Sequence, residues 1–305
     1  MRKIIYQLVF MAIVFQTQAQ SITKSLDQYM AQVKGGSYDP IPSKILNTKD
    51  VASLLTELNQ YQQDTIPKIR AKAYAIAKSV GQQSNQASIR SQAVSVLTQG
   101  LQDKDSGIID AVMEGLSGFL LEDFAARDKE RIGQYIDTAA IHLDMALKLA
   151  GWLQLTQFRI PIDQIIQSDA SFTDKWAARL ALCRMGDQAS TGYLLLKLSR
   201  APIDDDFVYD FVPGLVYTRN PEIFAYLETI IQSDQANCMS ADPDSSQKIL
   251  CGYRVMEYIA PVIVDFPLPV DEFGELMVAD YEQALQEVRV WLDQHETYEI
   301  QKEGF

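Results

Sequence analysis

The stretch from Pro67 to Leu101 reads PKIRAKAYAIAKSVGQQSNQASIRSQAVSVLTQGL, and it decides the fold class. Its apolar side chains recur at steps of three and four residues, which puts them on one face of an α-helix. In the first half of the stretch they are Ile69, Ala73, Ile76, Ala77 and Val80. Ile89, Ala93, Val96, Leu97 and Leu101 repeat the template twenty residues later. The sequence therefore predicts two successive amphipathic helices here.

Helical spacing continues on both sides of this stretch. Further helices are predicted over 48–61, 108–119, 176–183, 249–260 and 280–294. Gly81 and Gly186 follow predicted helices, and Pro221 opens another after Asn220, as helix ends and starts prefer. No long segment alternates with period two, so we expect an all-α protein with little or no sheet.

Several segments resemble repeats of the HEAT and armadillo type. PKIRAKAYAIAKSVG and ASIRSQAVSVLTQGL share Ile-Arg-x-x-Ala, while DKWAARLALCRMGD (174–187) looks like an alanine-rich second helix with its trailing Gly-Asp. RNPEIFAYLETII (219–231) and residues 242–261 look like further degenerate repeats. The resemblance implies a right-handed α-α superhelix of helix pairs with a partner-binding concave face. A non-repeating helical bundle is the alternative.

The two ends differ from the middle of the chain. Arg2 and Lys3, the apolar run from Leu8 to Phe15, and small residues before a cut after Ala19 predict a signal peptide over 1–19. The run is too short for a membrane span, and no later stretch is long and apolar enough for one. We expect an N-terminal helical segment over 20–63 and the repeats over 64–265. A Pro-rich connector, a capping helix and a tail, frayed or packed back, follow over 266–305.

Charge and composition limit the classes of partner. The chain is 47% hydrophobic and 22% charged, which is typical of a folded protein, and its formal net charge is −13. An acidic surface repels phosphate backbones, so we expect no nucleic-acid partner. A basic protein or peptide fits this charge. Arg70 and Arg90 are expected to pair with carboxylates of neighbouring repeats, as packing and not as function.

Cysteine usage is sparse. Cys238 and Cys251 flank a short polar stretch, and in an oxidising compartment they either form a disulfide or remain two buried thiols. Cys183 lies in an apolar helical run and is expected to be a core residue.

Candidate binding residues cluster after Pro202. Three adjacent carboxylates precede a run of aromatics, and this set forms either the start of a helix or a partner-binding edge. The candidates are Asp204, Asp205, Asp206, Tyr209 and Tyr217.

Signals for catalysis and metals are weaker. Residues 242–246 open like a calcium loop, but Gln247 and Tyr253 stand where that loop needs Gly and Glu. His142 and His295 are far apart, and no nucleophile motif accompanies His142, which is expected on a helix. We therefore predict no catalytic residues, no metal site and no cofactor.

The sequence as a whole predicts an exported protein, periplasmic, cell-surface or secreted. Its expected role is a non-enzymatic binding or scaffold protein that uses a helical-repeat surface for protein or peptide interaction. One alternative is an all-helical hydrolase or carbohydrate-active enzyme with paired carboxylates. The other is a structural subunit of an envelope assembly.

Overall fold

Nearly all regular structure in the chain is helical, which confirms the all-α prediction. The structure is a computed structural model, and it describes residues 22–138, 141–240, 242, 244 and 246–305. The predicted signal peptide lies outside these residues. Contacts divide the chain into two compact units, Met1–Ala146 and Leu147–Phe305.

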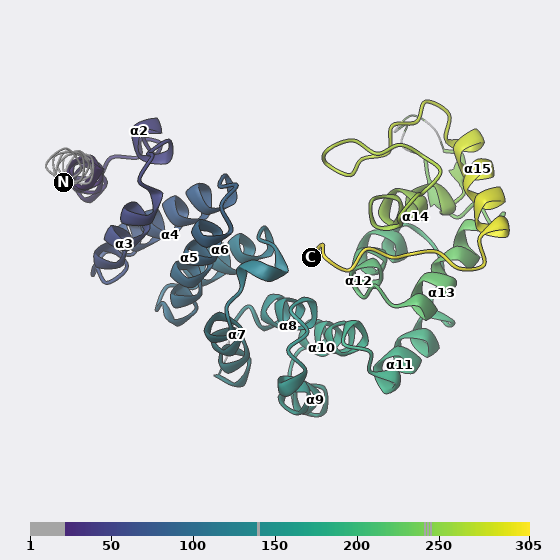
Figure 1. The fold of residues 1–305 in the computed structure, drawn as a ribbon. Helices are drawn as coiled ribbons and strands as arrows, with labels where there is room; N and C mark the ends of the chain where they lie inside the picture. Colours follow the sequence, from purple (N-terminus) through teal and green to yellow (C-terminus); the bar gives the residue numbers. More distant parts are fainter. Residues whose placement is uncertain (1–21, 139–140, 241, 243, 245) are drawn as a thin grey trace, which may run out of the picture. The chain divides into compact units, whose positions relative to one another are not determined.

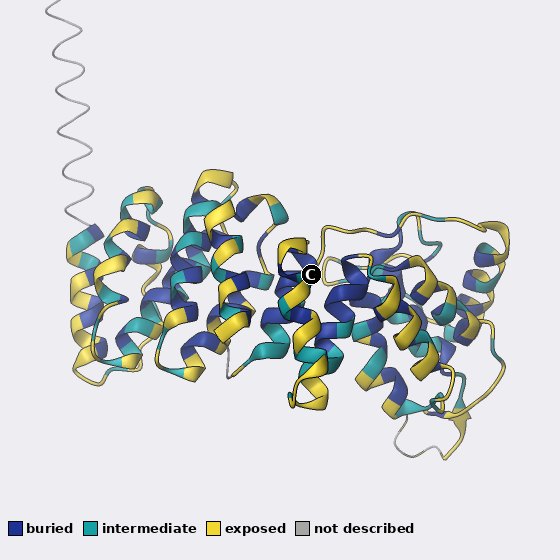
Figure 2. Ribbon diagram, turned by 90° about the horizontal axis from the view of Figure 1, so that it is seen from below, coloured by how far each residue is buried: buried dark blue, intermediate teal, exposed yellow. Residues whose placement is uncertain are grey.

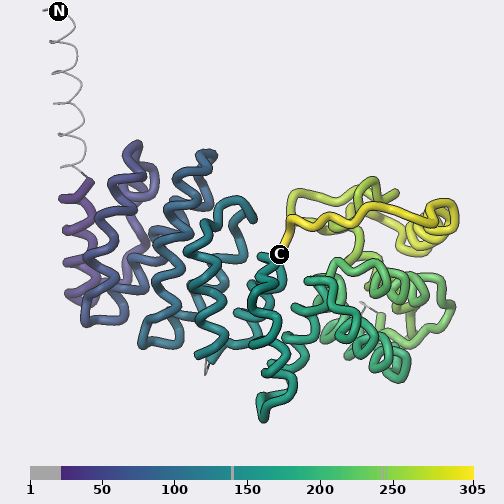
Figure 3. Tube along the Cα trace, turned by 60° about the horizontal axis from the view of Figure 1, so that its bottom comes forward, coloured from purple at the N-terminus to yellow at the C-terminus, as the bar shows by residue number. Residues whose placement is uncertain are grey.

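Unit 1 consists of short helices that alternate between two layers (Figures 1 and 3). α5 contacts α3 on one side and α7 on the other, while α4 contacts α6 in the second layer. A helix over 22–34 precedes them. The elements that follow it are α2 (Ser43–Leu46), α3 (Val51–Tyr61), α4 (Pro67–Gln82), α5 (Ala87–Gln99), η1 (Gly100–Gln102), α6 (Ser106–Ser117), η2 (Leu121–Asp123) and α7 (Ala126–Thr138).

The predicted apolar faces of α4 and α5 form the core of unit 1. Ile69, Ala73 and Ile76 of α4 are at most 1% exposed, and Ala93 and Leu97 of α5 are equally buried. In Figure 2 the buried positions lie where helices face one another and the exposed ones point outward. Burial of these faces, rather than helix propensity, therefore holds the layers together.

Side-chain contacts in unit 1 recur at a constant distance along the chain. Arg70 pairs with Asp103 and Arg90 with Asp123, in both cases across 33 residues, which confirms the expected pairing of the two arginines. Gln82 donates to the backbone oxygen of Gly115 across the same separation. The helices α4 and α5 are thus tied to the segment that follows them by contacts of one spacing.

Unit 2 begins within α8 and is also helical, apart from one hairpin. Its two-residue strands pair antiparallel, with Cys238 opposite Ile249. The elements are α8 (Leu143–Trp152), η3 (Thr156–Phe158), α9 (Arg159–Gln167), α10 (Phe172–Arg184), α11 (Gln188–Leu198), η4 (Phe207–Phe211), α12 (Val212–Tyr217), α13 (Pro221–Ile231), β1 (Cys238–Met239), β2 (Lys248–Ile249), α14 (Gly252–Ile259), η5 (Ala260–Val262) and α15 (Tyr281–Gln294).

A disulfide joins Cys238 and Cys251, whose Cα atoms lie 5.1 Å apart. The bond closes the loop that contains the hairpin, and both sulfur-bearing residues are buried. Cys183 is a free, buried thiol in α10, as expected for a core residue, and burial raises its pKa to about 11.

The tail of the chain packs back across unit 2 (Figure 1). The ring of Phe305 meets Trp152 edge-on at 5.6 Å, and Trp152 donates from Nε1 to the backbone oxygen of Glu303 at 2.9 Å. Arg184, 9% exposed, donates to the backbone oxygens of Lys302 and Gly304. Of the two outcomes left open by the sequence, the tail takes the packed one.

Candidate functional site

A widened helical turn carries the predicted aromatic residues of unit 2. Pro213 has no N–H to donate to the oxygen of residue 209, so the hydrogen-bond ladder shifts, and the N–H of Val212 donates five residues back to Phe207. The result is the π-helical turn η4, which leads directly into α12. It buries Phe207 and leaves Tyr209 53% exposed.

The three aspartates before η4 have different surroundings. Asp204 accepts a hydrogen bond from the N–H of Phe207 at 3.1 Å, so it caps the helical turn. Both oxygens of Asp205 accept from the N–H of Met239, at 3.1 and 2.9 Å, which ties η4 to the hairpin. Asp204 therefore fits the interpretation of these aspartates as the start of a helix. Asp206 is exposed and can still contact a binding partner.

Tyr217 does not belong to an exposed surface, and its assignment as a binding residue was wrong. It is 6% exposed, and its hydroxyl donates to the backbone oxygen of Lys148 at 2.5 Å. Its ring contacts Phe305 at 5.8 Å, and burial raises its pKa. The sequence could not show this, because the contacts come from segments 69 and 88 residues away.

A row of aromatic rings runs from the start of α10 to η4. Phe172 stacks on Trp176 at 6.1 Å, and Trp176 meets Phe211 edge-on at 5.3 Å. Phe172 is 69% exposed at the first position of α10, next to its cap Ser171. The available signal was an aromatic residue directly after a helix-capping serine, where the side chain points away from the helix core.

We refer to the exposed and half-exposed residues on and beside this turn as the η4 surface. Tyr209 and Phe211 are two positions apart and leave the helix on opposite sides, so the surface wraps around the turn. Asp206 lies three positions before Tyr209 and four before Asp210, which are spacings that share one face of a helical turn. Its members are Phe172, Trp176, Asp206, Tyr209, Asp210 and Phe211.

Negative charge is concentrated in the unit that carries the η4 surface. Between residues 22 and 146, 13 Lys and Arg accompany 15 Asp and Glu, whereas between 147 and 305, 12 Lys and Arg accompany 25 Asp and Glu. Unit 1 is therefore close to neutral, and unit 2 accounts for almost all of the acidic excess. Asp206 and Asp210 have no cationic partner among the residues that the structure describes.

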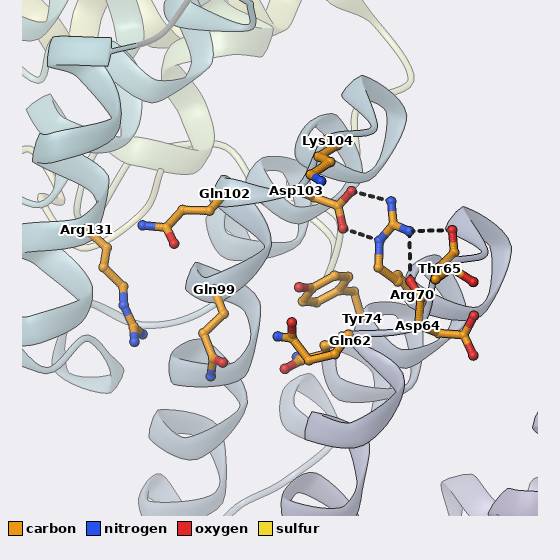
Figure 4. Close-up of a pocket in the computed structure, with 11 residues that line it drawn as sticks. Gln62, Asp64, Thr65, Arg70, Tyr74, Gln99, Gln102, Asp103, Lys104 and Arg131 are labelled. Carbon is orange, nitrogen blue, oxygen red and sulfur yellow. Dashed lines mark hydrogen bonds and ion pairs between the residues drawn. The ribbon is translucent and has the colours of Figure 1, made fainter.

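Unit 1 contains a polar cavity of about 570 Å³ between the α3–α4 and α5–α6 turns (Figure 4). Its wall includes the pair of Arg70 and Asp103, joined by two hydrogen bonds of 2.7 Å. Hydrogen bonding from Arg70 lowers the pKa of Asp103 against the opposing effect of burial. The lining residues are Gln62, Gln63, Asp64, Thr65, Arg70, Tyr74, Gln99, Gln102, Asp103, Lys104 and Arg131.

The histidines are not brought together. His142 precedes α8 instead of lying on a helix, with a φ of 49°, and its ring contacts Ser106 and Asp110. His295 caps the end of α15 and stacks on Trp291 at 4.4 Å. Within the described ranges, no three His, Cys, Asp or Glu side chains converge in a group able to hold a metal ion.

Comparison with known proteins gives no relative on which to base an assignment, because no family model matches the chain and no curated protein matches it. Over the part of the chain that the structure describes, no helix has the length and apolar character of a membrane span. Any functional assignment must therefore rest on the surfaces described above.

Proposed function

We propose that this chain is an exported binding protein made of HEAT-like helical repeats, and that the η4 surface binds a basic protein or peptide. The observation that carries the proposal is the exposed ring of Tyr209 on the same turn as the exposed carboxylates of Asp206 and Asp210, in the strongly acidic unit. Aromatic anchors with nearby charge are common at interface hot spots, and a basic partner would satisfy both features.

The recurring contacts of unit 1 support the repeat part of the proposal. Three side chains of the α4–α5 pair meet residues 33 positions further along the chain, as expected when one structural unit is stacked on the next. The same architecture in unit 2 and a superhelical path remain parts of the proposal.

The hydrolase alternative has less support. A general acid in a carboxylate pair needs a raised pKa, whereas the pKa of Asp103, one of the two carboxylates on the cavity wall, is lowered by Arg70. Asp103 is therefore no candidate for the general acid of such a pair.

The test reverses the charge of aspartates for which the structure shows no ion pair with another residue. The chain from Gln20 onward is immobilised, envelope extract is passed over it at low and moderate salt, and retained proteins are identified by mass spectrometry. The variant Asp206→Lys/Asp210→Lys is compared with Asp163→Lys/Asp169→Lys, which changes exposed aspartates away from η4 by the same charge.

The proposal predicts a basic protein retained by the wild type and by the Asp163/Asp169 variant but lost from the Asp206/Asp210 variant. Its retention should also weaken as salt rises, since exposed charges are screened. Equal loss from both variants would show a general charge effect, and retention by all three proteins would place the binding surface elsewhere.

A further inference from the structure

A basic stretch of the chain directly precedes the acidic η4 turn in unit 2. From Lys175 to Arg200, five Lys and Arg accompany a single Asp, whereas 204–210 holds four Asp and no Lys or Arg. The single aspartate, Asp187, caps α11 by accepting from the N–H of Ser190 at 2.7 Å. Positive and negative charge are therefore separated into neighbouring stretches, within a unit whose overall charge is strongly negative.

The basic side chains gather at the ring of Tyr193 on α11. The guanidinium carbon of Arg179, from α10, lies 4.5 Å from the centroid of this ring, and the ammonium nitrogen of Lys197 lies 5.6 Å from it. Lys175 lies one turn before Arg179 on the same face of α10, and the exposed Leu196 one turn after Tyr193 on α11. We refer to these residues as the α11 surface. Its members are Lys175, Arg179, Tyr193, Leu196 and Lys197.

The cations of the α11 surface are free to meet charges of another molecule. Among the residues that the structure describes, no carboxylate forms an ion pair with Lys175, Arg179 or Lys197. The same holds for Asp206 and Asp210 of the η4 surface, which lack a cationic partner. Unit 2 therefore carries two surfaces of opposite charge that do not neutralise each other.

One face of α10 joins the two surfaces. Phe172, Trp176 and Arg179 are spaced by four and three residues, so they lie on one side of the helix. Trp176 meets Phe211 of η4 edge-on at 5.3 Å. Arg179 reaches Tyr193 of α11, and α10 contacts both α11 and α12 (Figure 1). The acidic and the basic surface thus flank a shared stripe of α10, which begins with the exposed ring of Phe172.

Neighbouring surfaces of opposite charge on one face are complementary to a rotated copy of themselves. When two copies meet about a two-fold axis, each patch of one copy lies on the same second patch of the other. Here the acidic surface of each copy would lie on the basic surface of its partner. Unlike charges would then meet at both ends of the contact, and the exposed aromatic rings between them would be removed from water.

We propose that this face of α10 is a dimer interface, in which the η4 surface of each copy contacts the α11 surface of a second copy of this chain. The inference rests on the proposed function, because it takes the η4 surface as a binding surface and names its occupant. The second copy supplies the required basic groups through its α11 surface, although the chain as a whole is acidic.

The experiment exchanges charges across the proposed interface and measures the oligomeric state. The chain from Gln20 onward is studied by sedimentation velocity at about 0.15 M salt, where distant charges are screened. The η4 variant is Asp206→Lys/Asp210→Lys, and the α11 variant is Lys175→Glu/Lys197→Glu. Two control variants carry the same changes of charge at exposed residues outside both surfaces. They are Glu287→Lys/Glu296→Lys and Lys24→Glu/Lys44→Glu.

We expect the wild type and both controls to form dimers. The η4 variant and the α11 variant should each dimerise at least about tenfold more weakly, because like charges then face each other at both ends of the contact. An equimolar mixture of these two variants should recover the dimer. In the mixed pair the new Lys side chains face the new Glu side chains at one end, and the original charges meet at the other. Recovery also shows that both variants are folded.

Four results would overturn the inference. They are a wild type that stays monomeric up to about 0.2 mM, a dimer that neither surface variant weakens, an equal loss of the dimer in the controls, and a mixture that does not recover it. A monomeric wild type leaves the proposed function standing, because the extract experiment detects proteins other than this chain. An extract without a retained basic protein is the separate failure of the proposed function for such partners.

Discussion

The packing of α4 against α5 can be tested at Gly81, near the end of α4. A Cβ atom added there would lie 2.4 Å from the Cβ of Ala93 and 2.9 Å from a ring atom of Phe119. The Cβ of Ala93 is fixed to the backbone of α5 and cannot rotate away. Gly81→Ala therefore requires α4 and α5 to separate by more than 1 Å to restore ordinary carbon contacts of about 3.5–4.0 Å.

Two opposing effects decide how much Gly81→Ala changes the free energy of unfolding. Replacing Gly by Ala within a helix contributes about 1 kcal/mol of stability, while overpacking a close-packed core costs about 1–3 kcal/mol. Because the clash involves backbone-anchored atoms, we take the upper end of that cost. The expected net loss is then about 2 kcal/mol in the free energy of unfolding of unit 1.

Gly115 in α6 provides the matched control in the same unit. Its added Cβ would meet side-chain carbons of Lys78 at 3.3 and 3.6 Å, and this flexible, partly exposed side chain can move aside. Gly115→Ala should therefore raise stability, by about 0.5–1 kcal/mol. Urea unfolding followed by circular dichroism measures both variants. A Gly81→Ala protein as stable as the wild type would refute the packing argument.

Three further outcomes are expected. Replacing Cys238 and Cys251 by Ser should lower the unfolding free energy of unit 2 by about 3 kcal/mol, as estimated for a loop of this length, and equal urea midpoints with and without reductant would contradict this. The lowered pKa of Asp103 contributes stability that is present above the ordinary carboxyl pKa near 4. That contribution is lost as the pH falls through the lowered pKa. Asp103→Asn or Arg70→Gln should therefore make the free energy of unfolding fall less steeply between about pH 4 and lower pH. An unchanged fall would show that the Arg70–Asp103 pair does not contribute to the pH dependence of stability. Asn220 caps α13 by accepting from two backbone N–H groups, so Asn220→Ala should cost about 1–2 kcal/mol in thermal or urea unfolding, and a loss below a few tenths would show that the cap is dispensable.

Much of the helical structure could be predicted because the responsible interactions are local. The predicted helix over 280–294 is observed as Tyr281–Gln294, and the one over 48–61 as Val51–Tyr61. Apolar spacing and capping residues specify such segments within a few positions of each other. The pairing of Arg70 with a carboxylate could also be anticipated, because both lie in neighbouring segments of similar pattern.

The candidate site was harder to predict because its contacts are distant in sequence. Tyr217 points inward because it contacts α8 and the C-terminal tail. Neither the spacing of residues nor the composition predicts contacts between segments so far apart in sequence. The widened turn η4 could have been suspected from Pro213, but α-helical spacing was assumed through it.

The sequence distances of the contacts also set an order for folding. Unit 1 is joined by side chains about 33 residues apart, so each helix pair can close as soon as the next has been synthesised. Unit 2 joins Trp152 to Glu303 across 151 residues and Arg184 to Gly304 across 120. Its core cannot be completed until residues 302–305 arrive. During synthesis, unit 1 is therefore expected to be folded while Trp152 of unit 2 is still exposed. A chaperone would bind the chain in that interval.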